Sequence, residues 1–279
     1  MARHTIANPY SLSGTGLHGA APVTVTFRPA PSGTGIVFRR VDLPGAPSVP
    51  AHVEWVGVDQ LRTGVERDGV TALTVEHLMA AIFASELDDL HVELDAPELP
   101  AMDGSAAPYA AALAACGRHT LEGAPLEIIS PPMEVHEGDA HYLVEPAEGL
   151  TLTVTIDWTH PLIGRQTGTF DIAAGAFGSE LAAARTFGFA RDRERLMREG
   201  LALGADIENT VILSDDAVVN GPLRWPDEFV RHKAVDLLGD LALTGGRLHA
   251  HVTAVRPSHR GNVALARSLH AFILEEINR

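Results

Sequence analysis

Hydrophobic and polar residues alternate along several short segments, a pattern typical of half-buried β-strands. In the first third of the chain it occurs in Val23–Phe27 and Ile36–Arg40, which the turn-rich sequence Arg28–Gly33 separates. A further strand is expected at His91–Asp95. In the second half we expect strands at Leu126–Val135, His141–Glu145, Leu150–Asp157, Gln166–Asp171 and Arg247–Val255.

Helical sequence lies between these strands. We expect Thr74 to be the N-cap of a helix over Val75–Ser85, and Asp103–Ser105 to begin an alanine-rich helix that ends at Cys116. The remaining helices are expected over Phe177–Ala184, from Asp227, and from about His259 with Ser258 as its N-cap.

Both halves of the chain therefore run through strands, a helix, a strand and a helix. This shared order predicts two related α+β domains, residues 1–120 and 125–279, each with helices on one face of a sheet. The linker is expected within Gly117–Pro125, where a glycine ends the helical pattern and a proline precedes new β-type sequence. A functional site would lie between the two domains.

Composition narrows the class of protein. The chain is globular, with 46% apolar residues, and its formal net charge of −15 disfavours a nucleic-acid surface. The arginine-dense stretch Arg191–Arg198 contains Asp192 and Glu194 and predicts a solvated helix face. Cys116 is the sole cysteine, which excludes an intrachain disulfide. The start lacks a signal peptide and no segment approaches about 18 apolar residues, so we expect a cytosolic protein.

The helix from Asp227 carries the densest chemistry. His232, Asp236 and Asp240 are four residues apart and form one column on its face. An imidazole and a carboxylate one turn apart suit a zinc site, although two ligands do not complete one. Lys233 is the only lysine in the chain, which indicates a chemical role for an ammonium group, with chance as the alternative.

Two further histidines are candidates. His77 could supply a third metal ligand, and the adjacent Glu76 could act as a base toward a metal-bound water. The spacing is not that of the common zinc proteases, so this pair alone is a weak signal. His259 is interpreted either as a surface imidazole or as a general acid held protonated by a carboxylate such as Asp240.

The sequence Gly14–Gly19 superficially suggests a dinucleotide-binding loop. It lacks the preceding strand and the following helix of a βαβ unit, so this interpretation fails. The glycines are instead expected to permit a tight turn that presents His18.

Taken together and in order, several segments resemble the zinc-dependent UDP-3-O-acyl-N-acetylglucosamine deacetylases of lipid A biosynthesis. The matching segments run through nearly the whole chain. They are Ser13–His18, Arg28–Pro31, Phe38–Leu43, Thr74–Leu78, Met102–Pro108, Arg185–Phe189, and Asp227–Lys233 with Asp236 and Gly239–Leu241.

This resemblance implies a cytosolic amidohydrolase that removes acetate from a UDP-linked, 3-O-acylated N-acetylglucosamine. It implies a metal, Zn²⁺ with Fe²⁺ as the alternative in the cell, and an open position for water beside the protein ligands. The implied metal ligands are His77, His232 and Asp236. The implied catalytic residues are Glu76 as general base, Thr186 at the oxyanion, His259 as general acid and Asp240 as its partner. The implied substrate-binding residues are Lys233, His18, Arg256 and Phe187.

The resemblance also implies two domains with mainly antiparallel sheets and the helices sandwiched between them. We expect the protein to be a monomer. Inserted elements would correspond to part of Asp42–Asp68 and to Arg191–Val219, the latter forming the acyl-chain passage. Leu201–Leu203 is either a wall of that passage or local core.

The chain departs from the family around the last histidine. The family usually has Ser-Gly-His-x-Leu-Asn, whereas this chain has Pro257–Asn262, so Pro257 and Gly261 could alter the approach of His259. Arg256 stands where a lysine often contacts the nucleotide. Two alternatives stay open: a deacetylase of the same mechanism that acts on another nucleotide-sugar or acylated glucosamine, and a metal-stabilised binding protein without turnover.

Overall fold

The computed structural model describes residues 2–58, 61–173 and 175–277. Residues 10–94 contribute one sheet, with strands β2 (Tyr10–Thr15), β3 (Pro22–Pro29), β4 (Ile36–Arg40), β5 (Ser48–Pro50) and β9 (Leu90–Leu94). The strand order is β2-β3-β9-β4-β5, and neighbours are antiparallel except for β4 and β9.

Residues 127–255 contribute the second large sheet. Its strands are β11 (Glu127–Ile129), β12 (Met133–Glu137), β13 (Ala140–Glu145), β14 (Leu150–Asp157), β15 (Arg165–Asp171) and β18 (Arg247–Val255). Their order is β12-β13-β18-β14-β15, with β11 and β14 parallel to β18 and the other pairs antiparallel. Buried and half-buried residues alternate along all of β18, which confirms the predicted alternation.

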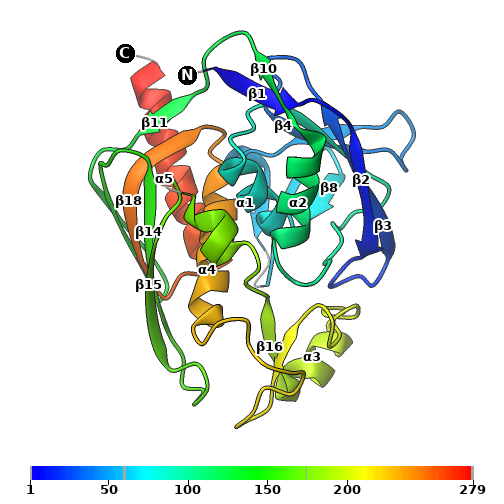
Figure 1. Ribbon diagram of the computed structural model, residues 1–279, viewed down its shortest axis with the longest axis vertical. Coiled ribbons are helices and arrows are strands. Elements are labelled where there is room, and N and C mark those ends of the chain that lie inside the picture. Colours follow the sequence, from blue (N-terminus) through cyan, green and yellow to red (C-terminus); the bar gives the residue numbers. More distant parts are fainter. Residues whose placement is uncertain (1, 59–60, 174, 278–279) are drawn as a thin grey trace.

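The α-helices of the described residues are α1 (Glu76–Ala84), α2 (Ala107–Cys116), α3 (Arg193–Arg198), α4 (Glu228–Ala242) and α5 (His259–Ile277). Figure 1 shows α1, α2, α4 and α5 between the two large sheets. The predicted α+β class is confirmed by this arrangement of helices and mostly antiparallel sheets. The division at residues 120–125 into two domains stays a prediction.

A glycine sets the distance between the two central helices. A Cβ atom added to Gly239 in α4 would lie 1.9 Å from the carbonyl oxygen of Glu76. Because glycine has no Cβ, the backbone of α4 can lie directly against the first turn of α1. This contact brings the polar column of α4 beside Glu76 and His77.

The structure corrects the predicted start of α1. Its N-cap is Val75, which makes no side-chain capping hydrogen bond. Thr74 has a positive φ of 58° and its hydroxyl donates to Glu98 at 2.9 Å. The N-cap prediction for Thr74 is therefore wrong, because a distant carboxylate binds the hydroxyl that would have capped the helix.

Other boundaries differ for local reasons. Part of the predicted linker is strand β10 (Arg118–Leu121), which pairs with β1 (Arg3–Ile6). The single strand predicted over Leu126–Val135 is interrupted at Pro131 and Pro132, which have no N–H to donate.

The helix predicted over Phe177–Ala184 is the short π-helix η2 (Phe177–Leu181). Ser258 is confirmed as a cap of α5, since its Oγ accepts the Gly261 N–H at 3.1 Å.

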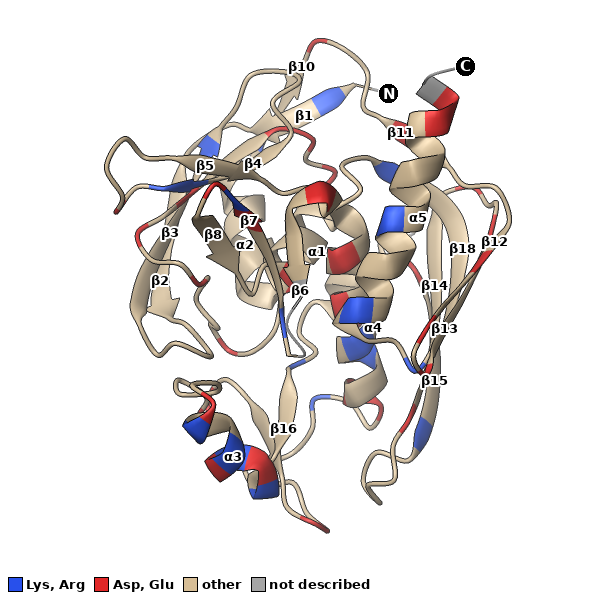
Figure 2. Ribbon diagram, turned by 180° about the vertical axis from the view of Figure 1, so that it is seen from behind, with Lys and Arg blue, Asp and Glu red and all other residues tan. Residues whose placement is uncertain are grey.

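The two predicted insertions form small structures of their own. After the 3₁₀ turn η1 (Val53–Trp55), strands β6 (Val56–Val58), β7 (Thr63–Arg67) and β8 (Val70–Leu73) make an antiparallel sheet, and residues 59 and 60 lie outside the described residues. In the second insertion β16 (Phe187–Phe189) pairs with β17 (Val211–Leu213), and η3 (Ala190–Asp192) and α3 lie between them. No residue of α3 is buried, and Figure 2 shows both charge signs along it, which confirms a solvated helix.

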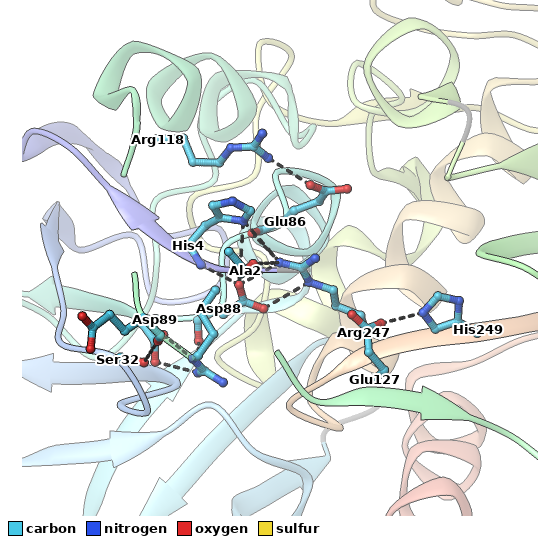
Figure 3. Close-up of polar contacts among 12 residues, drawn as sticks. Ala2, His4, Ser32, Glu86, Asp88, Asp89, Arg118, Glu127, Arg247 and His249 are labelled. Atoms are coloured by element: carbon cyan, nitrogen blue, oxygen red, sulfur yellow. Dashed lines mark hydrogen bonds and ion pairs between the residues drawn. The ribbon is translucent and has the colours of Figure 1, made fainter. Parts of the chain in front are cut away.

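A polar network joins the N-terminal strand to the second sheet (Figure 3). Arg247 of β18 donates two hydrogen bonds to the carboxylate of Asp88, at 3.2 and 2.8 Å. The same carboxylate accepts the backbone N–H of His4 at 2.7 Å. Asp88 therefore ties the loop after α1 to residues from both ends of the chain.

Candidate active site

Three potential metal ligands come together where α1 meets α4. His77 lies in the first turn of α1, and His232 and Asp236 lie one turn apart on α4. All three are buried, and their donor atoms lie within 4.8 Å of one another. Oδ1 of Asp236 is 3.5 Å from Nε2 of His77 and 3.4 Å from Nε2 of His232.

The remaining atoms of these ligands are oriented by other groups. Nδ1 of His232 faces the carbonyl oxygen of Ala184 at 3.1 Å, which leaves Nε2 directed at Asp236. Lys233 donates to Oδ2 of Asp236 at 2.7 Å. The unique lysine therefore engages one carboxylate oxygen while the other faces both imidazoles.

The electrostatics of the group fit a divalent cation. Burial lowers the pKa of His232 to about 4 in spite of the Asp236 charge, so this imidazole is neutral with a free lone pair. Burial alone would lower the pKa of His77, but the hydrogen bond to Asp236 together with the charges of Asp236 and Glu76 outweighs burial and raises the pKa. Two imidazoles and a carboxylate are a ligand set that zinc uses.

Glu76 lies beside this group without belonging to it. Its side chain is buried, and Oε2 accepts the backbone N–H of Thr63 in β7 at 3.1 Å. Burial raises the pKa of Glu76, and the nearby His259 and His77 partly oppose the shift. A carboxylate with a raised pKa is a stronger base than an exposed one.

His259 forms a second polar group at the start of α5. Its Nδ1 lies 3.1 Å from Oδ2 of Asp240 and 3.2 Å from the hydroxyl of Thr63. Asn262 donates to the same oxygen of Asp240 at 2.8 Å. Burial alone would lower the pKa of His259, but the charge and hydrogen bond of Asp240 outweigh it and raise the pKa to about 9. The imidazole is therefore a proton donor at neutral pH.

The atypical residues around His259 leave it in the site. A Cβ on Gly261 would lie 2.5 Å from the hydroxyl oxygen of Tyr142, so glycine allows α5 to approach β13 closely. His259 and Pro257 both line the cavity that contains the metal-ligand group.

This cavity has a volume of about 380 Å³ and collects most of the predicted site residues. His18, Thr186, Phe187 and Lys233 line it together with the three potential metal ligands, Glu76 and His259. Its apolar wall is formed by Trp158, Phe187, Phe189, Leu196 and Ala202. A site that combines convergent polar groups with an apolar wall suits an amphiphilic ligand.

Some of the predicted site residues do not line the cavity. Arg256 is not among the residues that line the cavity, and it donates to Asp157 at 2.9 Å. Asp240 lies behind His259 rather than on the wall. Of Leu201–Leu203, Ala202 lines the cavity, whereas Leu203 is 43% exposed.

Sequence reasoning missed Glu98, which organises one side of the site. This buried carboxylate accepts the backbone N–H of His18 at 2.9 Å and that of Gly19 at 2.7 Å, as well as the hydroxyl of Thr74. It therefore fixes both the turn that carries His18 and the entry to α1. Its contacts span up to 80 residues of sequence, so no local pattern reveals them.

A second missed residue, Glu228, anchors the segment before β16. Its buried carboxylate accepts hydrogen bonds from the backbone N–H of Arg185 at 3.0 Å and from the Arg185 guanidinium at 2.8 Å. This pair holds Thr186 and Phe187 against the start of α4. Arg185 and Glu228 both lie in segments that resemble the family, but no local pattern joins the two segments.

Comparisons with known proteins identify the family of the chain. Residues 3–271 match the family described as UDP-3-O-acyl N-acetylglycosamine deacetylase. A Myxococcus xanthus protein named UDP-3-O-acyl-N-acetylglucosamine deacetylase is 44% identical over 270 residues, which cover 96% of this chain and 86% of that protein. Proteins of the same name from Citrifermentans bemidjiense and Geotalea uraniireducens are 40% and 39% identical, over 96% and 99% of this chain and 88% and 89% of their own lengths. The predicted resemblance is confirmed, and the chain belongs to this metalloenzyme family of UDP-3-O-acyl N-acetylglycosamine deacetylases.

Proposed function

We propose that this protein hydrolyses the acetamide of UDP-3-O-acyl-N-acetylglucosamine, the compound in the names of its relatives, as a step of lipid A biosynthesis. The observation that carries the proposal is one cavity lined by three buried side chains that could bind a metal, a buried carboxylate and an imidazole paired with Asp240. These groups are what amide hydrolysis requires: an electrophile, a base and an acid.

The metal would be held by His77, His232 and Asp236. We propose Zn²⁺, with Fe²⁺ as the alternative in the cell, because both accept imidazole and carboxylate ligands. When bound, the ion supplies Lewis acidity that polarises a carbonyl group and acidifies water.

Glu76 is the general base in this proposal. It takes a proton from the water that attacks the carbonyl carbon of the acetamide, and the Thr63 N–H holds one of its oxygens in place. Its raised pKa, caused by burial, suits proton transfer near neutral pH. Thr186 helps to stabilise the negative charge that develops on the carbonyl oxygen.

His259 is the general acid. The C–N bond breaks as His259 donates a proton to the departing amine, and the products are acetate and the free amino-sugar. Asp240 orients the imidazole and favours its charged form. Asp240 acts through His259, so it is a positioning residue.

The rest of the cavity would bind the substrate. Lys233 and His18 supply polar contacts, and Phe187 with its aromatic neighbours forms an apolar surface for the acyl chain. Arg256 is proposed to bind the nucleotide outside the cavity, once its hydrogen bond to Asp157 is broken.

As part of the same proposal, residues 1–120 and 125–279 are two domains, and the protein acts as a cytoplasmic monomer. No described helix is long and apolar enough to cross a membrane.

Mixing the metal-loaded protein with the UDP-acyl-sugar and following acetate release tests this function. Stoichiometric acetate and amine products are expected. A non-catalytic binding protein would release neither, and a deacetylase for another acylated sugar would turn over that sugar faster. The paired base and acid favour turnover over binding alone.

A further inference from the structure

A second group of potential metal ligands lies outside the active-site cavity, between the first insertion and the last helix. His52 is the N-cap of η1, Glu54 belongs to η1, and His270 belongs to α5. One ligand atom from each lies within 4.8 Å of the others. The proposed function uses none of these residues.

The distances between donor atoms are close to those of a coordinated ion. Nδ1 of His52 is 3.5 Å from Oε2 of Glu54, and Nε2 of His270 is 3.9 Å from Oε1 of Glu54. Bonds of about 2.0 Å at tetrahedral angles separate ligand atoms by roughly 3.3 Å. The two distances exceed this value by about 0.2 and 0.6 Å, and the Glu54 side chain, which is 57% exposed, can move to shorten them.

Each imidazole presents a nitrogen to this group that makes no strong hydrogen bond among the described residues. Nε2 of His270 is buried and has no hydrogen-bond partner among the residues that the structure describes. Nδ1 of His52 accepts a long hydrogen bond from the Glu54 backbone N–H, at 3.4 Å. An unpartnered buried nitrogen is costly, and a metal bond would remove that cost.

An ion could reach this group from solvent. His52 and Glu54 lie on the wall of a separate cavity of about 360 Å³, which Trp55, Met79 and Arg247 also line. The rings of His52 and His270 meet edge to face, with centroids 4.5 Å apart. This geometry allows one nitrogen of each ring to face the same ion.

A third cluster, Glu134, His136 and His141, is a weaker candidate. It lies on the exposed hairpin of β12 and β13. Nε2 of His136 and Nε2 of His141 already contact Oε1 of Glu134, at 3.1 and 2.7 Å. The two rings are stacked, and both already share one carboxylate oxygen. This cluster serves as the comparison in the experiment below.

We propose that His52, Glu54 and His270 bind a divalent transition-metal ion such as Zn²⁺, and that the ion joins η1 to α5. The same junction contains the hydrogen bond from Arg267 of α5 to the carbonyl oxygen of Val56, at 3.0 Å. The bound segment leads into β7, whose Thr63 contacts both Glu76 and His259. The ion therefore stabilises the insertion that supports the active site.

Zinc binding to the wild-type protein, measured by calorimetric titration and elemental analysis after gel filtration, tests this proposal. Two ions per chain are expected for wild type and one for His270→Ala. The second ion should also raise Tm by several degrees in wild type. Glu54→Gln should lose the same ion, and this exposed substitution keeps the test valid if His270→Ala does not fold.

Two further variants separate the sites. His77→Ala/Asp236→Ala should bind one ion, at the new site, whereas His141→Ala should still bind two. The proposal is overturned if wild type binds a single ion, if His141→Ala rather than His270→Ala loses the second ion, or if Glu54→Gln and His270→Ala both retain two. These counts do not depend on turnover, so failure here is distinct from failure of the proposed deacetylation.

Discussion

Nδ1 of His259 lies 3.1 Å from Oδ2 of Asp240, and both residues are buried. The pair crosses from α5 to α4, so it forms only when the two helices pack. Asn262 holds the same carboxylate oxygen from the next turn of α5. This arrangement keeps the imidazole charged in spite of its burial.

The pH dependence of turnover should follow from this pair. Asp240 raises the pKa of His259 to about 9 against the effect of burial, so the acid form dominates below that pH. Activity should fall as the pH rises through about 9. Asp240→Asn removes the negative charge, leaves burial to lower the pKa, and should move the alkaline decline to lower pH.

Rate against pH for wild type and Asp240→Asn, at equal metal content, measures the shift. An unchanged alkaline limb in Asp240→Asn would show that another group causes it. Metal-replete His259→Ala should lose most turnover; activity within a few-fold of wild type would remove His259 from the acid role.

Metal content should depend on the three buried ligands. His77→Ala and Asp236→Ala should each lose the tightly bound catalytic ion, because two ligands hold zinc poorly. Elemental analysis after dialysis against a weak chelator measures the loss. His119→Ala, which replaces an exposed histidine, is the matched control and should keep the ion. Full metal content in both ligand variants contradicts the assignment.

Glu98 should contribute strongly to stability. Glu98→Ala removes a buried acceptor of two backbone N–H groups and one hydroxyl, and should lower the free energy of unfolding by about 3 kcal/mol. Glu66→Ala, at an exposed position, should change it by about 0.5 kcal/mol or less. Urea unfolding compares the two. Equal small effects would mean that backbone turns alone hold His18 and the entry to α1.

The aromatic wall should determine affinity for the acyl chain. The ring of Phe187 contacts those of Trp158 and Phe229, with centroids 5.8 and 5.0 Å apart. Phe187→Ala should raise KM for a long-chain acyl substrate by roughly 10-fold, about the effect of losing one buried side chain. The change should be smaller for a short-chain analogue. Equal changes for both substrates would place the acyl chain elsewhere.

Local periodicity predicted much of the fold. The strands Ile36–Arg40, Leu150–Asp157 and Arg247–Val255 have their predicted bounds, because each alternates and is flanked by turn residues. The α4 column also follows from helical geometry, which places Asp236 one turn after His232. Predictions failed where a distant group outcompetes a local preference. The Glu98 carboxylate, for example, accepts the hydrogen bond of the Thr74 hydroxyl, which was expected to cap α1.

The site could be predicted only in part. The family resemblance named all three potential metal ligands, and the structure brings their donor atoms together. The close contact of Gly239 with Glu76 cannot be seen in either local sequence, since it joins residues more than 160 positions apart. The orientation of Arg256 toward Asp157 likewise depends on β14 lying beside β18.

The central claim is that Glu76 activates water in a deacetylase whose ion is held by its neighbours. The most direct measurement is acetate release from UDP-3-O-acyl-N-acetylglucosamine by wild type and by Glu76→Gln, with metal content determined on the same samples. Glutamine keeps the shape and the contact with Thr63 but cannot accept the proton, so we expect wild-type release and a decrease of roughly 100-fold or more at unchanged metal content. Acetate release by Glu76→Gln at the wild-type rate, with metal unchanged, would contradict the account.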